Sequence, residues 1–216
     1  MKQRKFRLFL SLGLLSSFVL WTLLVRFVDV RQIGPDGSSV GFAGMNGCFH
    51  ALTGVHMGLY TVTDWLGLIP LVFIIGFALL GLVQWIQRKH LLQVDRSVLV
   101  LGGFYLVTMA AYLLFETVVI NYRPVLIGGI LEASYPSSTT LLVMTVMPTA
   151  ILQLRTRIRH KVFRGCVIVL IAGFTVFMVI GRLLSGVHWL TDIVGGILLS
   201  TALVLLYLSV TKKADP

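Results

Sequence analysis

The chain has 216 residues, of which 57% are hydrophobic and 12% are charged, with a mean hydropathy of +0.94. Soluble domains are about one quarter charged, so this composition excludes an ordinary soluble protein and indicates an integral membrane protein with a single domain, residues 1–216. The net charge of +10 would indicate nucleic-acid binding in a soluble protein. Here the basic residues fall mostly in alternate loops, as membrane topology requires, and no nucleic-acid partner is expected.

Six apolar runs reach or approach the roughly 20 residues that a helix needs to cross a bilayer. We therefore expect an all-α fold, a polytopic bundle of six transmembrane helices. The expected spans are residues 6–28, 60–85, 98–120, 139–154, 162–180 and 193–210. The fourth run is short, and we expect it to gain length from neighbouring residues or from packing inside the bundle. The first run is too long for a signal peptide and has no small-x-small cleavage site after it, which predicts an uncleaved span.

The distribution of lysine and arginine predicts the orientation of the bundle. Fourteen of the 18 basic residues lie at the N-terminus, in the second–third and fourth–fifth loops and in the tail, all on one side. Because basic loops stay in the cytoplasm, we expect both termini there. The outer side keeps Arg26, Arg31, Arg123 and Arg182. Cys48 and Cys166 fall toward opposite sides, so we expect no disulfide between them.

The first outer loop, residues 29–59, is long and rich in glycine. Its apolar residues recur at steps of three and four, at Phe42, Met45, Phe49 and Leu52. This spacing is typical of a short helix lying in the membrane interface, and the alternative is a loop packed over the bundle. His50 and His56 lie in the same loop, and we expect ordinary loop or interface roles for them.

Two of the outer arginines lie in otherwise apolar surroundings. Arg123 follows the third span and Arg182 follows the fifth. An arginine near the bilayer is costly unless it is paired, and its planar guanidinium suits bidentate recognition of phosphate. Between them, the Tyr-Pro-Ser-Ser-Thr-Thr segment at 135–140 leads into an apolar run. A proline in the first helical turn followed by hydroxyl side chains and free N–H groups is typical of an anion site, although an ordinary N-cap is the alternative.

His188 and Asp192 complete the predicted phosphate site. They are four residues apart, so on a helix they share a face. A carboxylate beside an imidazole fixes its tautomer and raises its basicity, which frees the other nitrogen for attack or proton transfer. A lone histidine near a membrane interface is usually structural. The pair follows Arg182 on the same side as the two other anion-binding segments, which favours a functional role.

These segments resemble the motifs of the type 2 phosphatidic acid phosphatase (PAP2) superfamily of membrane lipid phosphatases. The family patterns K-x6-R-P, P-S-G-H and S-R-x5-H-x3-D correspond to Glu116-x6-Arg123-Pro124, Pro136-Ser137-Ser138-Thr139 and Gly181-Arg182-x5-His188-x3-Asp192. The six-span layout and the order of the motifs match as well, so the resemblance extends over essentially the whole chain.

The resemblance implies a PAP2-like fold and a reaction that needs no metal ion or cofactor. It implies that His188 is the nucleophile, forming a phosphohistidine, and that Asp192 orients it. The residues implied to bind the substrate phosphate are Arg123, Ser137, Ser138, Thr139 and Arg182. The implied partners are a lipid phosphate and the bilayer, and the oligomeric state is not predicted.

Four motif positions differ from the family pattern. Glu116 replaces lysine, Ser138 glycine, Thr139 histidine and Gly181 serine. In the family the replaced histidine protonates the leaving group, which threonine cannot do near neutral pH. A lipid diphosphate would not need this acid, because it expels a phosphate monoester. Alternatively Glu116, desolvated near the bilayer, donates the proton, receives an amine of the substrate, or forms a structural ion pair with Arg123 or Arg182.

We therefore expect a membrane phosphatase that hydrolyses a lipid phosphate or diphosphate at the extracytoplasmic face. A polyprenyl diphosphate, phosphatidylglycerol phosphate and phosphatidic acid all fit this class. Two alternatives remain open. One is a lipid phosphotransferase, in which an alcohol attacks the phosphohistidine at His188. The other is a non-catalytic member that binds or transports a phosphorylated lipid.

Overall fold

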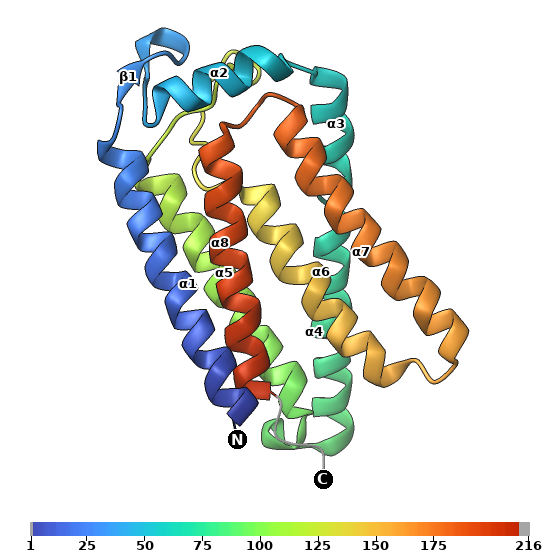
Figure 1. The fold of residues 1–216 in the computed structure, drawn as a ribbon. Helices are drawn as coiled ribbons and strands as arrows, with labels where there is room; N and C mark the ends of the chain where they lie inside the picture. Colours follow the sequence, from blue (N-terminus) through green and yellow to red (C-terminus); the bar gives the residue numbers. More distant parts are fainter. Residues whose placement is uncertain (1, 212–216) are drawn as a thin grey trace.

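The structure, a computed structural model, describes residues 2–211 and is a bundle of long helices with a small outer layer at one end (Figure 1). Its elements in chain order are α1 (Lys2–Phe27), β1 (Arg31–Gln32), η1 (Pro35–Gly37), β2 (Ser39–Val40), α2 (Ala43–Thr53), α3 (Met57–Leu66), α4 (Ile69–Arg88), η2 (Leu91–Gln93), α5 (Arg96–Thr117), α6 (Ser138–Arg157), α7 (Lys161–Leu184) and α8 (Leu190–Thr211).

The predicted spans are confirmed as helices, with one interruption. Within the described residues, five helical stretches are long and apolar enough to cross a membrane: α1, α3 with α4, α5, α7 and α8. The predicted second span is divided between α3, which ends at Leu66, and α4, which begins at Ile69. Pro70 lies in the first turn of α4 and has no N–H to donate to the preceding turn, so the backbone breaks there.

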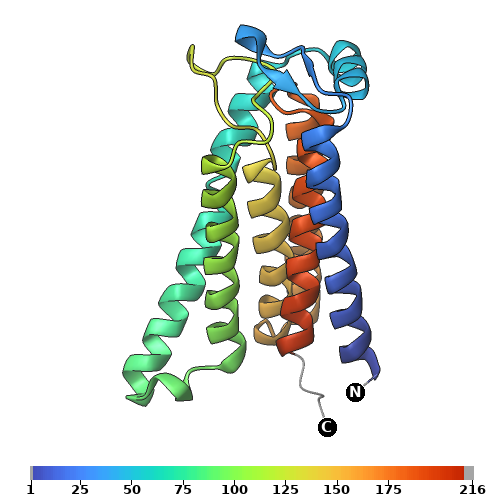
Figure 2. The ribbon, with the colours of Figure 1, turned by 90° about the vertical axis from the view of Figure 1, so that its left-hand side faces the viewer.

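The fourth span, α6, lies inside the bundle, which accounts for its polar residues. It runs from Ser138 to Arg157 and so is longer than the predicted 139–154. It packs against α4, α5, α7 and α8 and is surrounded by them in both ribbon views (Figures 1 and 2). Because α6 faces protein instead of lipid, it carries buried polar groups; Thr149 Oγ1, for example, lies 3.0 Å from the Tyr105 hydroxyl. The expectation that the fourth span gains length and packs centrally is confirmed.

The outer layer covers the end of the bundle where the site lies. It consists of the β1–β2 hairpin, α2 and the segment between α5 and α6 (Figures 1 and 2). The expected outer helix exists as α2, and it is also seated on the bundle, because Asn46 donates to the Thr191 hydroxyl at 3.0 Å. Leu52, in the last turn of the same helix, is 80% exposed. The two alternatives for this loop are therefore combined in a helix packed on α8.

The opposite end of the bundle holds the start of α1 and the α4–α5 and α6–α7 connections, which carry the basic residues (Figure 1). There Asp95 lies 3.1 Å from Arg88 and 3.5 Å from Arg157, so it joins the two connections. The basic loops and the outer layer thus lie at opposite ends, as the charge pattern predicts.

Candidate active site

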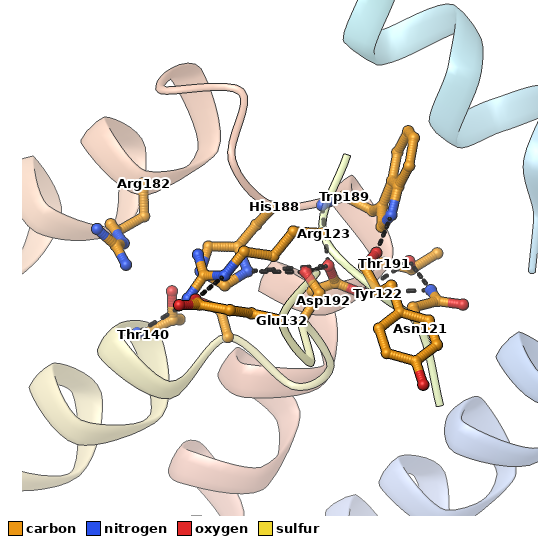
Figure 3. A network of polar contacts seen from close by, with 12 residues as sticks. Asn121, Tyr122, Arg123, Glu132, Thr140, Arg182, His188, Trp189, Thr191 and Asp192 are labelled. Atoms are coloured by element: carbon orange, nitrogen blue, oxygen red, sulfur yellow. Dashed lines mark hydrogen bonds and ion pairs between the residues drawn. The ribbon is translucent and has the colours of Figure 1, made fainter. Parts of the chain in front are cut away.

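The site lies beneath the outer layer and is built from three segments: a hairpin between α5 and α6, the N-terminus of α6, and the connection from α7 to α8. Figure 3 shows the polar network that joins them, with Arg182 and Thr140 on the His188 side and Asn121 and Thr191 on the Asp192 side. Of the residues labelled in Figure 3, Glu132 and Tyr122 are partly exposed and the others are buried.

The hairpin between α5 and α6 was not predicted from the sequence. Its arms pair through Ser134 N to Asn121 O at 2.9 Å and Arg123 N to Glu132 O at 3.0 Å. The turn is Gly128-Gly129, and both glycines have positive φ angles, 59° and 80°. Two glycines between apolar residues are a recognised signal for a two-residue hairpin turn. The hairpin places Asn121, Arg123 and Ser134 in the site.

Asp192 anchors the hairpin to α8. It is fully buried, and its carboxylate accepts from four donors: the Ser134 hydroxyl, Trp189 N at 2.9 Å, Asn121 Nδ2 at 3.4 Å and the Thr191 hydroxyl at 3.4 Å. Asp192 is the third residue of α8 and receives the N–H of the residue before that helix, which is half of a capping box. Asp192 therefore both caps the start of α8 and holds its own carboxylate in place.

His188 lies in the connection before α8, which begins at Leu190. The premise that a helix runs through both His188 and Asp192 is therefore wrong. The imidazole Nδ1 lies 3.9 Å from Asp192 Oδ2, beyond hydrogen-bond distance, and the Ser134 hydroxyl lies between them, 3.0 Å from Nδ1. Gly186 permits this connection, because it has a φ of 71° and a Cβ there would lie 2.1 Å from the Gly54 carbonyl oxygen.

The environment of His188 keeps its imidazole neutral. The side chain is buried, and burial lowers its pKa well below the ordinary 6.5. The positive charges of Arg123 and Arg182 lower the pKa further. Arg123 Nη1 lies 3.3 Å from His188 Nε2. A neutral imidazole keeps a lone pair on one ring nitrogen, which an attack on phosphorus requires.

Two buried arginines flank the imidazole. Arg123 forms an ion pair with Glu132, with Nε and Oε2 2.9 Å apart, but the Nε hydrogen is not aligned with any acceptor in residues 2–211. Arg182 is 1% exposed, lies over the Tyr60 ring at 5.0 Å and pairs with Asp64 at 3.5 Å. Its Nε also has no acceptor within the described part of the chain. Buried donors without acceptors are typical of an anion site.

The N-terminus of α6 contributes backbone N–H groups. Ser137 is the N-cap, and its hydroxyl accepts from Thr140 N at 3.4 Å. The first N–H groups of a helix have no partner within it and carry its positive dipole end. Pro136 precedes the cap and therefore lies before the first turn; the prediction that it lies within that turn is wrong. The buried Thr140 hydroxyl, which belongs to the predicted 135–140 segment but was not singled out in it, has no partner among residues 2–211.

Two cavities adjoin this helix terminus. An apolar cavity of about 270 Å³ lies between α4, α5 and α6, with Ser138 and Thr139 in its wall. A second cavity, of about 420 Å³, is lined by residues that include Glu116, Arg123, Glu132 and Ser138. Ser138 borders both of them, so the phosphate-binding candidates connect an apolar space with a charged one.

The altered motif positions differ in their surroundings. Glu116 is exposed at the end of α5, and within the described residues it has no ion-pair partner. The alternative in which Glu116 pairs with Arg123 or Arg182 is therefore not seen among residues 2–211, where Glu132 pairs with Arg123 and Asp64 with Arg182. Glu132 was not singled out from the sequence, although an acid so close to Arg123 in one outer loop was a usable signal.

The two outer histidines serve the loop structure. His50 Nε2 lies 3.1 Å from the Gly186 carbonyl oxygen, and His56 Nε2 lies 2.9 Å from that of Thr53. The first contact joins α2 to the connection between α7 and α8, and the second is local to the end of α2. The ordinary loop roles expected for these histidines agree with these contacts.

Comparison with known proteins identifies the fold and the family. The fold is similar to that described as "Crystal structure of the first transmembrane PAP2 type phosphatidylglycerolphosphate phosphatase from Bacillus subtilis", at 18% sequence identity and a TM-score of 0.58. The similarity covers 91% of this chain and 93% of that one. No curated protein sequence matches the chain significantly. Residues 72–216, which contain all three motif segments, match the family model described as PAP2 superfamily. The chain is a multi-pass membrane protein that belongs to the PAP2 superfamily.

Proposed function

We propose that this protein is a membrane phosphatase that hydrolyses a lipid phosphate or diphosphate, with His188 as the nucleophile. The observation that carries the proposal is the convergence of a buried neutral imidazole with two buried arginines. Arg123 contacts His188 Nε2 at 3.3 Å, and Arg182 keeps an Nε hydrogen without an acceptor within residues 2–211. This arrangement favours a phosphate group bound beside Nε2.

The reaction takes two steps. The Nε2 lone pair of His188 attacks phosphorus, the N–P bond forms, and the bond from phosphorus to the leaving oxygen breaks. A lipid diphosphate releases a lipid monophosphate, whereas a lipid monophosphate releases an alkoxide that takes up a proton to become the alcohol. Water then attacks the phosphohistidine, the N–P bond breaks, and the proton lost by water passes to solvent. Orthophosphate leaves, and the imidazole is restored. Arg123, Arg182 and the backbone N–H groups that begin α6 stabilise the equatorial oxygens. These charges allow the reaction to proceed without a metal ion.

The apolar cavity supports a lipid substrate. It lies between helices that cross the membrane, and Ser138 and Thr139 border it at the N-terminus of α6. A lipid chain in this cavity would carry its phosphate toward the two arginines without leaving the bilayer. The chain therefore passes from hydrocarbon into an apolar cavity and exposes no methylene group to water, which would cost about 0.8 kcal/mol each.

We further propose that the site faces the extracytoplasmic side. The basic connections lie at the opposite end of the bundle, and basic loops stay in the cytoplasm. Cys48 is exposed in α2 at the site end and provides a native probe. In a Cys166→Ser background, a membrane-impermeant thiol reagent should label Cys48 in intact cells. In a Cys48→Ser, Cys166→Ser, Lys89→Cys variant it should label the protein only after lysis. The reverse pattern contradicts this orientation.

Two of the altered motif positions, Thr139 and Glu116, bear on the substrate preference. Thr139 borders the apolar cavity and has no side-chain acid to protonate an alkoxide. We propose that a lipid diphosphate is preferred, because its phosphate leaving group needs no protonation, and that Glu116 acts as a substrate selector or as the acid. Glu116 and Arg123 line the same cavity, so an ammonium group on the substrate would meet a carboxylate beside its phosphate.

The decisive experiment is phosphate release by purified protein in lipid nanodiscs. The panel contains undecaprenyl diphosphate, phosphatidylglycerol phosphate and phosphatidic acid, with and without a metal chelator. His188→Ala should abolish release, whereas the control His56→Ala, which changes an exposed histidine of the outer layer, should retain it. Absence of release from every lipid, or full activity in His188→Ala, contradicts the proposal.

Variants of the altered positions test the substrate preference. Thr139→His and Glu116→Lys, alone and together, should increase hydrolysis of the monophosphates relative to the diphosphate. If the wild type already hydrolyses monophosphates as fast as the diphosphate, the missing-acid argument is wrong. Adding a lipid alcohol separates hydrolysis from phosphotransfer, because a transferase would form a phosphorylated acceptor in place of orthophosphate. Lipid binding without turnover, preserved in His188→Ala, would indicate a non-catalytic protein.

A further inference from the structure

The proton positions around His188 follow from its two neighbours. An arginine has donors only, so the 3.3 Å contact between Arg123 Nη1 and His188 Nε2 requires Nε2 to be the acceptor. In a neutral imidazole the proton then lies on Nδ1. The first contact thus fixes which imidazole nitrogen carries the proton.

The Ser134 hydroxyl leads to the same assignment independently. It has a single hydrogen, which it donates to Asp192 Oδ2. Its 3.0 Å contact with His188 Nδ1 must therefore use a lone pair of the hydroxyl oxygen, and Nδ1–H is the donor. The chain of donors runs from His188 to Ser134 and on to Asp192. Both contacts give the same tautomer, with the Nε2 lone pair toward the arginines.

We infer that Ser134 is a positioning residue, whose hydroxyl connects Asp192 to His188 and holds the imidazole in the Nδ1–H tautomer. Direct contact does not suffice, because Nδ1 and Oδ2 are 3.9 Å apart. Ser134 is 3% exposed, so water does not readily replace its hydroxyl. Its backbone is fixed as well, since Ser134 N donates to Asn121 O in the hairpin. The role in turnover rests on the proposed function, whereas the tautomer does not.

The Ser134 hydroxyl also stabilises the positive charge that develops on the imidazole in the proposed reaction. When Nε2 bonds to phosphorus, positive charge spreads over the imidazole and strengthens the Nδ1–H donor. Ser134 accepts this hydrogen bond and continues to donate its own hydrogen to the Asp192 carboxylate. The negative charge of Asp192 therefore stabilises the charged imidazole through the hydroxyl. The hydrogen-bond chain therefore supports both the ground-state tautomer and the charged intermediate.

The tautomer can be measured without any substrate. Protein labelled with ¹⁵N at histidine, in nanodiscs, is examined by long-range ¹H–¹⁵N NMR at neutral pH, and His188→Gln identifies the His188 signals. The wild type should show a protonated Nδ1 and an unprotonated Nε2. Ser134→Thr, which keeps the hydroxyl, should show the same pattern, and Ser134→Ala should lose it. A wild-type imidazole protonated at Nε2 overturns the inference, whatever the variants do.

Turnover provides the second measurement. Ser134→Ala should lower kcat for the best lipid of the panel by roughly 10- to 100-fold, the usual range for a residue that orients a histidine. KM should change little, and Ser134→Thr should recover most of kcat. The control is Ser200→Ala, another buried serine, whose hydroxyl donates only to backbone carbonyls of α8. It should leave kcat unchanged.

Two further results would contradict the inference. One is Ser134→Ala with wild-type kcat and the wild-type tautomer. The other is an equal loss of kcat in Ser134→Ala and Ser200→Ala, which would indicate a packing effect. Failure of the phosphatase proposal is distinct from both, because a protein that releases no phosphate still has a measurable His188 tautomer.

Discussion

Arg123 and Glu132 face each other across the hairpin, with Nε and Oε2 2.9 Å apart. A substrate phosphate that binds Arg123 must displace this carboxylate or share the guanidinium with it. Glu132 is therefore a competitor for the charge that the substrate needs, and its side chain, 40% exposed, can turn toward solvent when phosphate binds.

Replacing Glu132 by glutamine should strengthen phosphate binding. An ion pair that is partly exposed contributes about 0.2–1 kcal/mol, so KM should fall by roughly 1.5- to 5-fold while kcat changes little. Steady-state phosphate release measures both constants. Asp36→Asn, which removes an exposed acid elsewhere in the outer layer, should leave KM unchanged. A higher KM in Glu132→Gln would show that this carboxylate helps to bind the substrate.

Arg182 should not tolerate lysine. Its guanidinium is 1% exposed, lies over the Tyr60 ring and reaches Asp64 and Thr63, a geometry that a single ammonium group cannot reproduce. Arg182→Lys should lower kcat/KM by roughly 10²- to 10³-fold, the typical effect of removing one transition-state donor. Arg26→Lys, at an exposed outer arginine, is the matched control and should keep wild-type kcat/KM. Equal activity of the two variants would exclude Arg182 from the phosphate site.

The pH dependence should report the lowered pKa of His188. Protonation removes the lone pair, so activity is lost as pH falls through this pKa. Burial and the charges of Arg123 and Arg182 lower it below 6.5, so the loss should occur below pH 6.5. A hydrogen bond with Ser134 acts in the opposite direction and raises the pKa of His188. The rate is measured at saturating lipid with two lipids whose phosphates ionise at different pH. This comparison separates ionisation of the enzyme from ionisation of the substrate. A common acid limb at or above 6.5 contradicts the assignment.

Gly181 should not accept the serine of the family motif. A Cβ at this position would lie 2.7 Å from Thr63 Cγ2, so α3 and α7 approach each other too closely for a side chain. Gly181→Ser should cost about 1–3 kcal/mol of stability through overpacking. The thermal unfolding midpoint in nanodiscs should fall, and Thr63→Ala should recover it. Gly173→Ser in the same helix is the control, since among residues 2–211 nothing outside the helix's own turn comes within 4 Å of a Cβ there. A fall of the same size in both variants would rule out the contact with Thr63.

The spans could be predicted because the bilayer imposes long apolar helices. The start of α6 could also be predicted from the local sequence, since Ser137 caps the helix that follows it. The break between α3 and α4 was missed because hydropathy alone is continuous across Gly67 and Leu68. A proline two residues later was the local signal for it, at Pro70.

The connections within the site could not be predicted, because they join residues far apart in the sequence. Ser134 meets Asp192 across 58 positions and His188 across 54, and only the fold brings them together. The spacing of His188 and Asp192 suggested direct contact on one helix. The structure instead ends α7 before His188 and inserts a hydroxyl from the hairpin. Glu132 lies close to Arg123 in the sequence, and it was missed because the hairpin whose arms pair the two residues was not predicted.

The most direct test of the central claim is the trapping of a phosphohistidine. Wild-type protein is mixed with undecaprenyl diphosphate labelled in its terminal phosphate and quenched within milliseconds. We predict an acid-labile, base-stable label on the peptide that contains His188, absent in His188→Ala and retained in His56→Ala. Release of phosphate by the wild type with no label on His188, or with the label on another residue, would contradict the account.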